Sequence, residues 1–153
     1  MKVSAEQIKK LREKCGAGIM ECRRALEEFE GNEEKAFEAI KQKGLEIAEK
    51  KKERETKAGI IEVYSHAGGK VVGVVELLSE TDFVAKNDEF KNLAHELSMQ
   101  VAAMNPKDRQ ELLEQDYIRD SSVKVKDLVN EVIGKIRENI QIGRIARFEV
   151  GEE

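Results

Sequence analysis

The chain has few side chains of the kinds that perform covalent catalysis or bind metal ions. Its 153 residues include two histidines, His66 and His95, and two cysteines, Cys15 and Cys22. Neither histidine belongs to a serine or cysteine nucleophile motif. The cysteines lack the further ligands of a zinc site, and seven residues along one helix do not give disulfide geometry. We predict two reduced thiols packed as small hydrophobic side chains, with no cofactor and no metal site.

Other chemistries are also weakly indicated. Gly69-Lys70 is not a phosphate-binding loop, because Val71 follows where Ser or Thr is required and no glycine stands five positions before Gly69. We therefore expect no nucleotide to be bound by this chain itself. Carboxylates are abundant, but their spacing follows the pattern of solvated helix faces. An enzyme that uses a pair of carboxylates therefore ranks last of the three functions considered for this chain.

The charge balance limits the class of partner. Charged residues make up 38% of the chain, and the net charge is -4. Direct binding of nucleic acid is not expected, because it needs a basic excess. The N-terminus enters a charged helix, and no run of about 18 apolar residues follows. We expect a cytoplasmic protein that does not bind membranes.

One connection carries an unexplained aromatic residue. Ser79-Glu80-Thr81-Asp82-Phe83-Val84-Ala85-Lys86-Asn87 leaves a strand pattern and enters a helix, and Phe83 is one of only five Phe in a chain without Trp. Phe83 either packs under the sheet, as aromatics usually do, or is a wedge presented to a partner. The residues alone leave both readings open. We refer to residues 79–87 as the Phe83 loop.

Residues 1–45 predict a three-helix bundle. Ser4 and Gln7 form a capping-box pattern, Gly16 to Gly18 make a turn, and Gly44 is expected to end the third helix. The second helix has a buried stripe of Ile19, Cys22, Leu26 and Phe29. Met20 lies off that stripe beside the turn, so it is either a partner contact or an ordinary exposed methionine. Residues 46–57 read as a charged helical linker.

Residues 58–153 predict an α+β core, in which a small three-stranded antiparallel sheet is packed with helices. The strands are expected at 60–66, 70–78 and 140–150, and helices at 88–104 after the N-cap Asn87, within 107–120 and from Ser122. Arg144 interrupts the apolar face of the last strand, which indicates a bulge or an interface. Strand 70–78 is apolar on both faces, so a second sheet or subunit is expected to cover one of them.

With these elements in place, the chain resembles the elongation factor Ts family along nearly all of its length. The matching segments are Leu11-Arg12-Glu13-Lys14-Cys15-Gly16-Ala17-Gly18-Ile19-Met20, the more specific Thr81-Asp82-Phe83-Val84-Ala85-Lys86-Asn87, His66-Ala67-Gly68-Gly69-Lys70 and Arg147-Phe148-Glu149-Val150. Cys15 stands where the family usually has Thr, and Arg137 where it commonly has Gly. The chain resembles the short form with one core subdomain, whose N-terminal bundle is similar to ubiquitin-associated domains.

The resemblance implies a guanine-nucleotide exchange factor that binds elongation factor Tu with GDP and is not an enzyme. The implied partner-binding positions are Arg12, Ile19, Met20, His66, Thr81, Asp82, Phe83 and Val84. Phe83 would enter the partner near its bound Mg²⁺ and disturb the phosphate site, with Thr81 and Val84 supporting the loop. A solvated turn histidine is the alternative for His66.

The short form implies a homodimer, in agreement with the two apolar faces of strand 70–78. A contact at Ile136 and Arg137 is doubtful because the family pattern is broken there. The alternative function is a protein-binding adaptor with a ubiquitin-associated-like bundle and no exchange activity.

Overall fold

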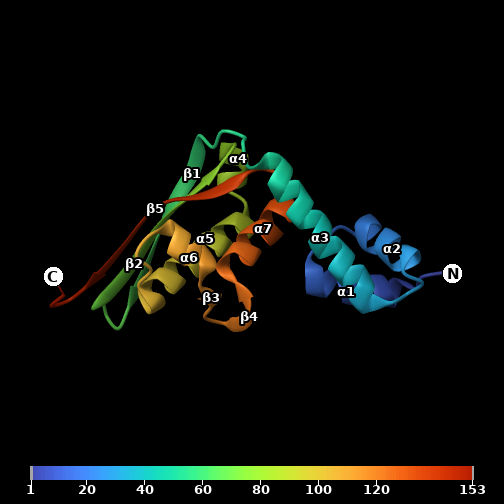
Figure 1. Cartoon of the computed structure of the whole chain (residues 1–153), viewed down its shortest axis with the longest axis horizontal. Helices are drawn as coiled ribbons and strands as arrows, with labels where there is room; N and C mark the ends of the chain where they lie inside the picture. Colours follow the sequence, from blue (N-terminus) through green and yellow to red (C-terminus); the bar gives the residue numbers. More distant parts are fainter. Residues whose placement is uncertain (1, 153) are drawn as a thin grey trace.

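The computed structural model describes residues 2–152, and the molecule is elongated, with a helical bundle at one end and a sheet at the other (Figure 1). The helices are α1 (Ala5–Cys15), α2 (Ile19–Glu28), α3 (Glu33–Lys51), α4 (Asp82–Ala85), α5 (Asp88–Met104), α6 (Arg109–Glu114) and α7 (Val125–Ile136). The strands are β1 (Ala58–His66), β2 (Val71–Ser79), β3 (Asp116–Tyr117), β4 (Asp120–Lys124) and β5 (Ile140–Glu149). The predicted α+β class is confirmed.

The first helices enclose a small core of their own. The predicted capping box begins α1, where Ser4 Oγ accepts from the Gln7 amide at 3.1 Å and Gln7 Oε1 accepts from the Ser4 amide at 2.9 Å. Gly16 ends α1 in the left-handed region at φ 67°, which an L side chain rarely adopts. The buried residues of this core are small, and they are Leu11, Cys15, Ala17, Cys22, Ala25, Leu26 and Ala36.

The expected end of the third helix at Gly44 is wrong. Helix α3 continues through Gly44 to Lys51, and it joins the bundle to the core as one rod (Figure 1). Gly44 instead lies where α3 crosses α7, and a Cβ added to Gly134 of α7 would lie 2.8 Å from the Gly44 Cα. Gly44 thus allows the two helices to pack closely, and its cost is the lower intrinsic helix propensity of glycine.

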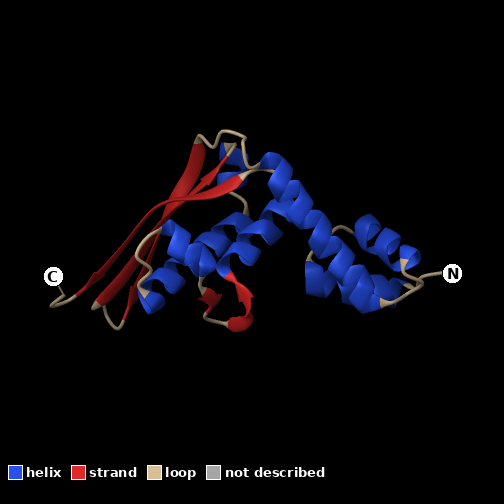
Figure 2. Ribbon diagram, viewed as in Figure 1, coloured by secondary structure: helices blue, strands red, loops and turns tan. Residues whose placement is uncertain are grey.

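The core sheet has the predicted three antiparallel strands, in the order β1-β2-β5. Helices lie on one side of it, and the other side is bare in the ribbon (Figure 2). Val75 and Leu77 of β2 face the helices and are buried, together with Phe90 and Leu97 of α5. Gly73 allows α5 to come close, because a Cβ there would lie 2.2 Å from the Ser98 carbonyl oxygen.

A bulge in β5 alters which side chains share a face. Between Val75 and Leu77 the partner residue shifts from Ile145 to Ile142, so one β2 residue, Glu76, lies opposite both Gly143 and Arg144. The predicted interruption at Arg144 is confirmed, but the single apolar face expected for Ile140, Ile142, Ala146, Phe148 and Val150 is wrong. One extra residue reverses the alternation, so Ile142 is buried while Phe148 is exposed.

The C-terminal helices pack between the sheet and the bundle. Helix α6 lies within the predicted range 107–120. The expected helix start at Ser122 is wrong: Ser122 belongs to β4, and α7 begins at Val125 after the N-cap Lys124. The small β3–β4 ribbon was not predicted, and buried Gln100 of α5 supports it by donating to the Asp116 carbonyl and accepting from the Ile118 amide.

Candidate protein-binding site

The Phe83 loop presents its aromatic side chain to solvent. Thr81 is the N-cap of α4, and its Oγ1 accepts from the Val84 amide at 3.3 Å. Phe83 is 92% exposed, whereas Val84 and Ala85 of the same turn are buried in the core. Asp82 is exposed beside Phe83. The single helical turn therefore has an anchored apolar side and an outward side that carries an acid and a phenyl ring.

Two carboxylates fasten this loop to the segment between α7 and β5. The Thr81 amide donates to Glu138 Oε1 at 3.1 Å, and the Thr81 hydroxyl donates to Glu138 Oε2 at 2.8 Å. In return, Glu80 Oε1 accepts from the Asn139 amide at 2.8 Å. Arg54 lies 3.4 Å from the other oxygen of Glu80. Glu138 thus accepts the backbone N–H of Thr81, which follows Glu80, and Glu80 accepts the backbone N–H of Asn139, which follows Glu138.

The bundle presents a second exposed apolar pair at its α1–α2 turn. Ile19 is 53% and Met20 55% exposed, and Arg12 on α1 is exposed as well. The expectation that Ile19 belongs to the buried stripe of α2 is wrong. Ile19 is the first residue of the helix, and its side chain lies outside the small core of the bundle. Glu21, which follows Met20, places its Oε2 3.9 Å from Nη2 of Arg137 in the core.

His66 lies away from these groups. It ends β1 and pairs with Val71, while Ser79, next to the Phe83 loop, pairs with Ala58 at the opposite end of the hairpin. Nine residues per strand separate the two ends by about 25 Å at ~3.3 Å per residue. The His66 ring is exposed, and its Nδ1 lies 2.9 Å from the Tyr64 hydroxyl. The structure groups Thr81, Asp82, Phe83 and Val84 but does not bring His66 to them.

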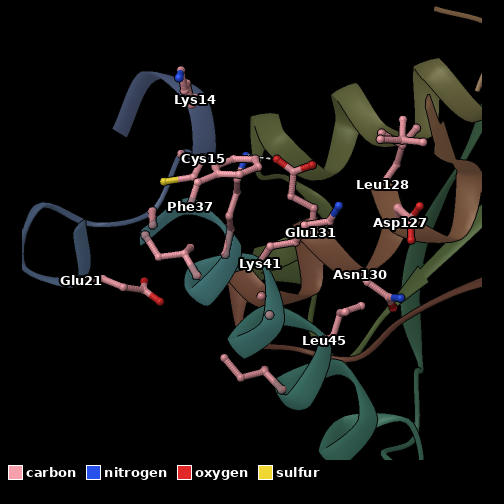
Figure 3. A pocket seen from close by; sticks show the side chains of 18 of the residues that line it. Lys14, Cys15, Glu21, Phe37, Lys41, Leu45, Asp127, Leu128, Asn130 and Glu131 are labelled. Carbon is pink, nitrogen blue, oxygen red and sulfur yellow. Dashed lines mark ion pairs between the residues drawn. The ribbon is translucent and has the colours of Figure 1, made fainter. Parts of the chain in front are cut away.

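A cavity of about 560 Å³ lies between the bundle and the core. Figure 3 shows side chains from α1 and α3 on one side of it and from α7 on the other. Its lining mixes apolar groups such as Phe37 and Leu128 with charged groups such as Lys41 and Glu131. The residues of the Phe83 loop do not line it, so this cavity is separate from the exposed aromatic.

The two cysteines are free and buried, as predicted. The prediction that they lie along one helix is wrong, because Cys15 ends α1 and Cys22 lies in α2, with the two sulfurs 3.7 Å apart. Burial, followed by the hydrogen bond to Cys15, raises the pKa of the Cys22 thiol to about 12. A thiol with such a pKa is almost entirely protonated at neutral pH and is a poor nucleophile.

Within residues 2–152, no group of three or more His, Cys, Asp and Glu side chains could hold a metal ion. Over the same residues, no helix has both the length and the apolar character needed to cross a bilayer. The candidate site is a set of exposed apolar side chains. It consists of two exposed apolar groups, Phe83 on the core and Ile19-Met20 on the bundle.

Comparison with known proteins decides the family. A family model described as Elongation factor TS matches residues 80–153. The chain is 44% identical to the elongation factor Ts of Thermotoga neapolitana, with 100% of both chains covered. It is 40% identical to that of Herpetosiphon aurantiacus, with 99% of both chains covered. The chain belongs to the elongation factor Ts family. The resemblance carried by the Phe83 loop and the N-terminal signature is confirmed.

This chain is a short member of the elongation factor Ts family. The alignment with the Thermotoga neapolitana relative extends over 196 positions, while the chain has 153 residues, so that relative contains segments this chain lacks. Residues 80–87 of the Phe83 loop, together with Glu138 and Asn139, fall inside the range matched by the family model.

Glu80 and Glu138 were not predicted as residues that hold the site. Glu138 is 57 residues from Thr81 along the chain, and no local pattern links the two. A signal was available only for the loop itself, in the acid and aromatic that stand between a strand and a helix.

Proposed function

We propose that this chain is a guanine-nucleotide exchange factor that binds elongation factor Tu with GDP and promotes GDP release by disturbing the Mg²⁺ and phosphate site of that partner. It acts by binding and not as an enzyme, in the cytoplasm. The supporting observation is the 92% exposure of Phe83 at the tip of an anchored turn. A large aromatic held in water gains its burial energy only when a partner covers it.

The physical basis of the exchange is differential binding. An inserted aromatic that fits only a distorted phosphate site favours the state of the partner that binds GDP weakly. Because linkage is reciprocal, the factor by which this chain weakens GDP binding equals the factor by which GDP weakens binding of this chain. No substrate bond is made or broken, and the exchange equilibrium is reached faster through a ternary complex.

The bundle supplies a second contact. Arg12, Ile19 and Met20 are proposed to dock on the nucleotide-binding domain of elongation factor Tu, while Asp82 and Phe83 act on the phosphate site. The exposed Ile19-Met20 pair supports this assignment. His66 would make a separate contact at the far end of the hairpin. Two distant contacts on one partner increase affinity only if the spacing between them is held.

We also propose that the bare face of the sheet is covered by a second copy of this chain. Ile61 and Val63 of β1 and Phe148 and Val150 near the C-terminus are all exposed on it. Val72, which pairs with Phe148, and Val74, which pairs with Ala146, continue the same face across the sheet. Such an apolar face, interrupted only near the Glu76–Arg144 ion pair, is unusual on a monomer. A sheet packed on its own copy would bury it in the manner of a β-sandwich.

The alternative is an adaptor that binds proteins through the bundle and has no exchange activity. The two hypotheses differ in the role of Phe83, which an adaptor of this kind does not need. Stopped-flow release of fluorescent GDP from elongation factor Tu separates them. The exchange proposal requires faster release with the wild-type chain, and an unchanged release rate with retained binding would favour the adaptor.

A further inference from the structure

The Phe83 loop is short and exposed, and its internal hydrogen bonds each span only a few residues. Helix α4 has four residues, and within it the Thr81 hydroxyl caps only the Val84 amide. A turn of this size is too short to be stable alone, because helix nucleation is unfavourable. The direction in which Phe83 points must therefore be set by the contacts that tie the loop to the rest of the core.

Two of those contacts are made by the carboxylates of Glu138 and Glu80, which link the Phe83 loop to the segment between α7 and β5. Both oxygens of Glu138 are used on one residue, Thr81, through its amide and its hydroxyl. The Thr81 hydroxyl donates to Glu138 and accepts from Val84, so the carboxylate also orients the cap of α4. Hydrogen bonds to an ionised acceptor are among the stronger ones in proteins.

The segment that carries Glu138 is itself anchored to the core. Asn139 is 2% exposed, and its side-chain amide donates to the Arg54 carbonyl at 2.6 Å. Arg137 adopts φ 68° as the C-cap of α7, so the chain turns sharply just before Glu138. Glu138 is thus presented toward an exposed loop from a turn that buried Asn139 anchors.

We propose that Glu138 is a positioning residue for Phe83: it holds the Thr81 cap so that the ring is already aimed at the partner before binding. The inference rests on the proposed exchange function and adds to it the residue that pre-organises the inserted aromatic. Pre-organisation lowers the ordering cost of association, which is about 0.5–1.5 kcal/mol per immobilised side chain, or roughly a 2- to 10-fold effect on affinity.

The first test needs no partner. Backbone amide relaxation by NMR is measured for Asp82 and Phe83 in the wild type and in Glu138→Ala. We expect order parameters near 0.85, typical of rigid backbone, to fall toward 0.6 in the variant. Glu138→Gln keeps one acceptor oxygen and should lie between. Glu131→Ala is the matched control, since that carboxylate pairs with Lys135 on its own helix. Unchanged order parameters in Glu138→Ala would overturn the proposal.

The second test is a double-mutant cycle on affinity for elongation factor Tu with GDP, measured beside GDP release, because Phe83→Ala leaves no accelerated release to compare. In the wild-type background Glu138→Ala should weaken this affinity roughly 2- to 10-fold. It should also slow accelerated release roughly 2- to 10-fold, with a nearly unchanged melting temperature because water can replace an acceptor at exposed Thr81. In a Phe83→Ala background the same substitution should have no further effect on partner affinity. An equal loss in both backgrounds would show that Glu138 does not act through Phe83.

The two tests distinguish the failures. If the wild-type chain does not accelerate GDP release, the exchange function is contradicted, whatever the loop does. If release is accelerated but the loop stays rigid without the Glu138 carboxylate, the exchange function stands and the positioning role is overturned.

Discussion

Gly44 and Gly134 meet where α3 crosses α7, so closely that a Cβ on Gly134 would lie 2.8 Å from the Gly44 Cα. The contact is not symmetric, because a Cβ on Gly44 would find the Gly134 Cα at an ordinary 3.8 Å. This crossing joins the helix of the bundle to the core. It therefore helps to set the position of Ile19-Met20 relative to Phe83.

The asymmetry predicts opposite effects for two identical substitutions. Gly134→Ala should destabilise the protein by about 1–3 kcal/mol, because the helices must separate. Gly44→Ala should be neutral or stabilising by up to about 1 kcal/mol, because alanine favours a helix over glycine and fits the space. Thermal unfolding of the two variants checks this. Equal effects of the two would contradict the close crossing.

We expect replacement of Arg137 by glycine to stabilise the folded state. It occupies the left-handed region at φ 68°, a conformation that costs an L residue roughly 1–2 kcal/mol relative to glycine. The ion pair it would lose, to Glu21 at 3.9 Å, is long and partly exposed. Arg137→Gly should therefore raise the melting temperature. Arg137→Ala keeps the strain and removes the pair, so it should not; a stabilised Ala variant would point to another cause.

Phe83 and Phe90 form a matched pair of phenylalanines in neighbouring elements. Phe83 is 92% exposed and Phe90 is 0% exposed. Phe83→Ala should abolish accelerated GDP release while the melting temperature stays nearly constant. Phe90→Ala should cost about 3–5 kcal/mol of stability, as truncation of a core aromatic does. A large loss of stability in Phe83→Ala would mean that the ring is packed in solution.

The Cys22 thiol predicts a specific loss of stability in alkali. Burial raises its pKa from 9.0 to about 12, so the folded state holds the proton more tightly than the unfolded state. Its contribution is fully present below about pH 9 and is lost as the pH rises toward about 12. Denaturant unfolding at several pH values should show a shallower alkaline fall for Cys22→Ala than for the wild type.

Thiol chemistry supplies an independent check of the same pKa. Iodoacetamide reacts with the thiolate, so Cys22 should be alkylated far more slowly at pH 8 in the folded chain than in the unfolded chain. Peptide mass spectrometry locates the modified residue. Rapid labelling of Cys22 in the folded protein would contradict its burial.

We expect the bare sheet face to form a dimer interface that a single charge placed on it would disrupt. Phe148→Glu places a carboxylate on the apolar face, and an unpaired charge in an interface is strongly unfavourable. Sedimentation at micromolar concentration should give a dimer for the wild type and a monomer for the variant. Lys86→Glu, a change of charge at an exposed position outside the sheet, is the control. A wild-type chain that sediments at 17.3 kDa would refute the dimer.

The sequence by itself determined most of the secondary structure and the kind of site to look for. Capping residues such as Ser4 and Asn87, and stripes such as Phe90, Leu93 and Leu97, act through hydrogen bonds and contacts only a few residues away. Local patterns therefore place helices well. Where a glycine can serve either a helix end or a close contact, as at Gly44, the pattern is ambiguous, and the prediction there was wrong.

Tertiary structure decided what the sequence left open. Whether Phe83 packs under the sheet or points outward depends on Val84 and Ala85 filling that space, and on a carboxylate 57 residues away holding Thr81. The exposure of Ile19 and the face reversal in β5 were also decided by packing. Contacts between distant segments depend on how whole elements fit together, and no local periodicity encodes that fit.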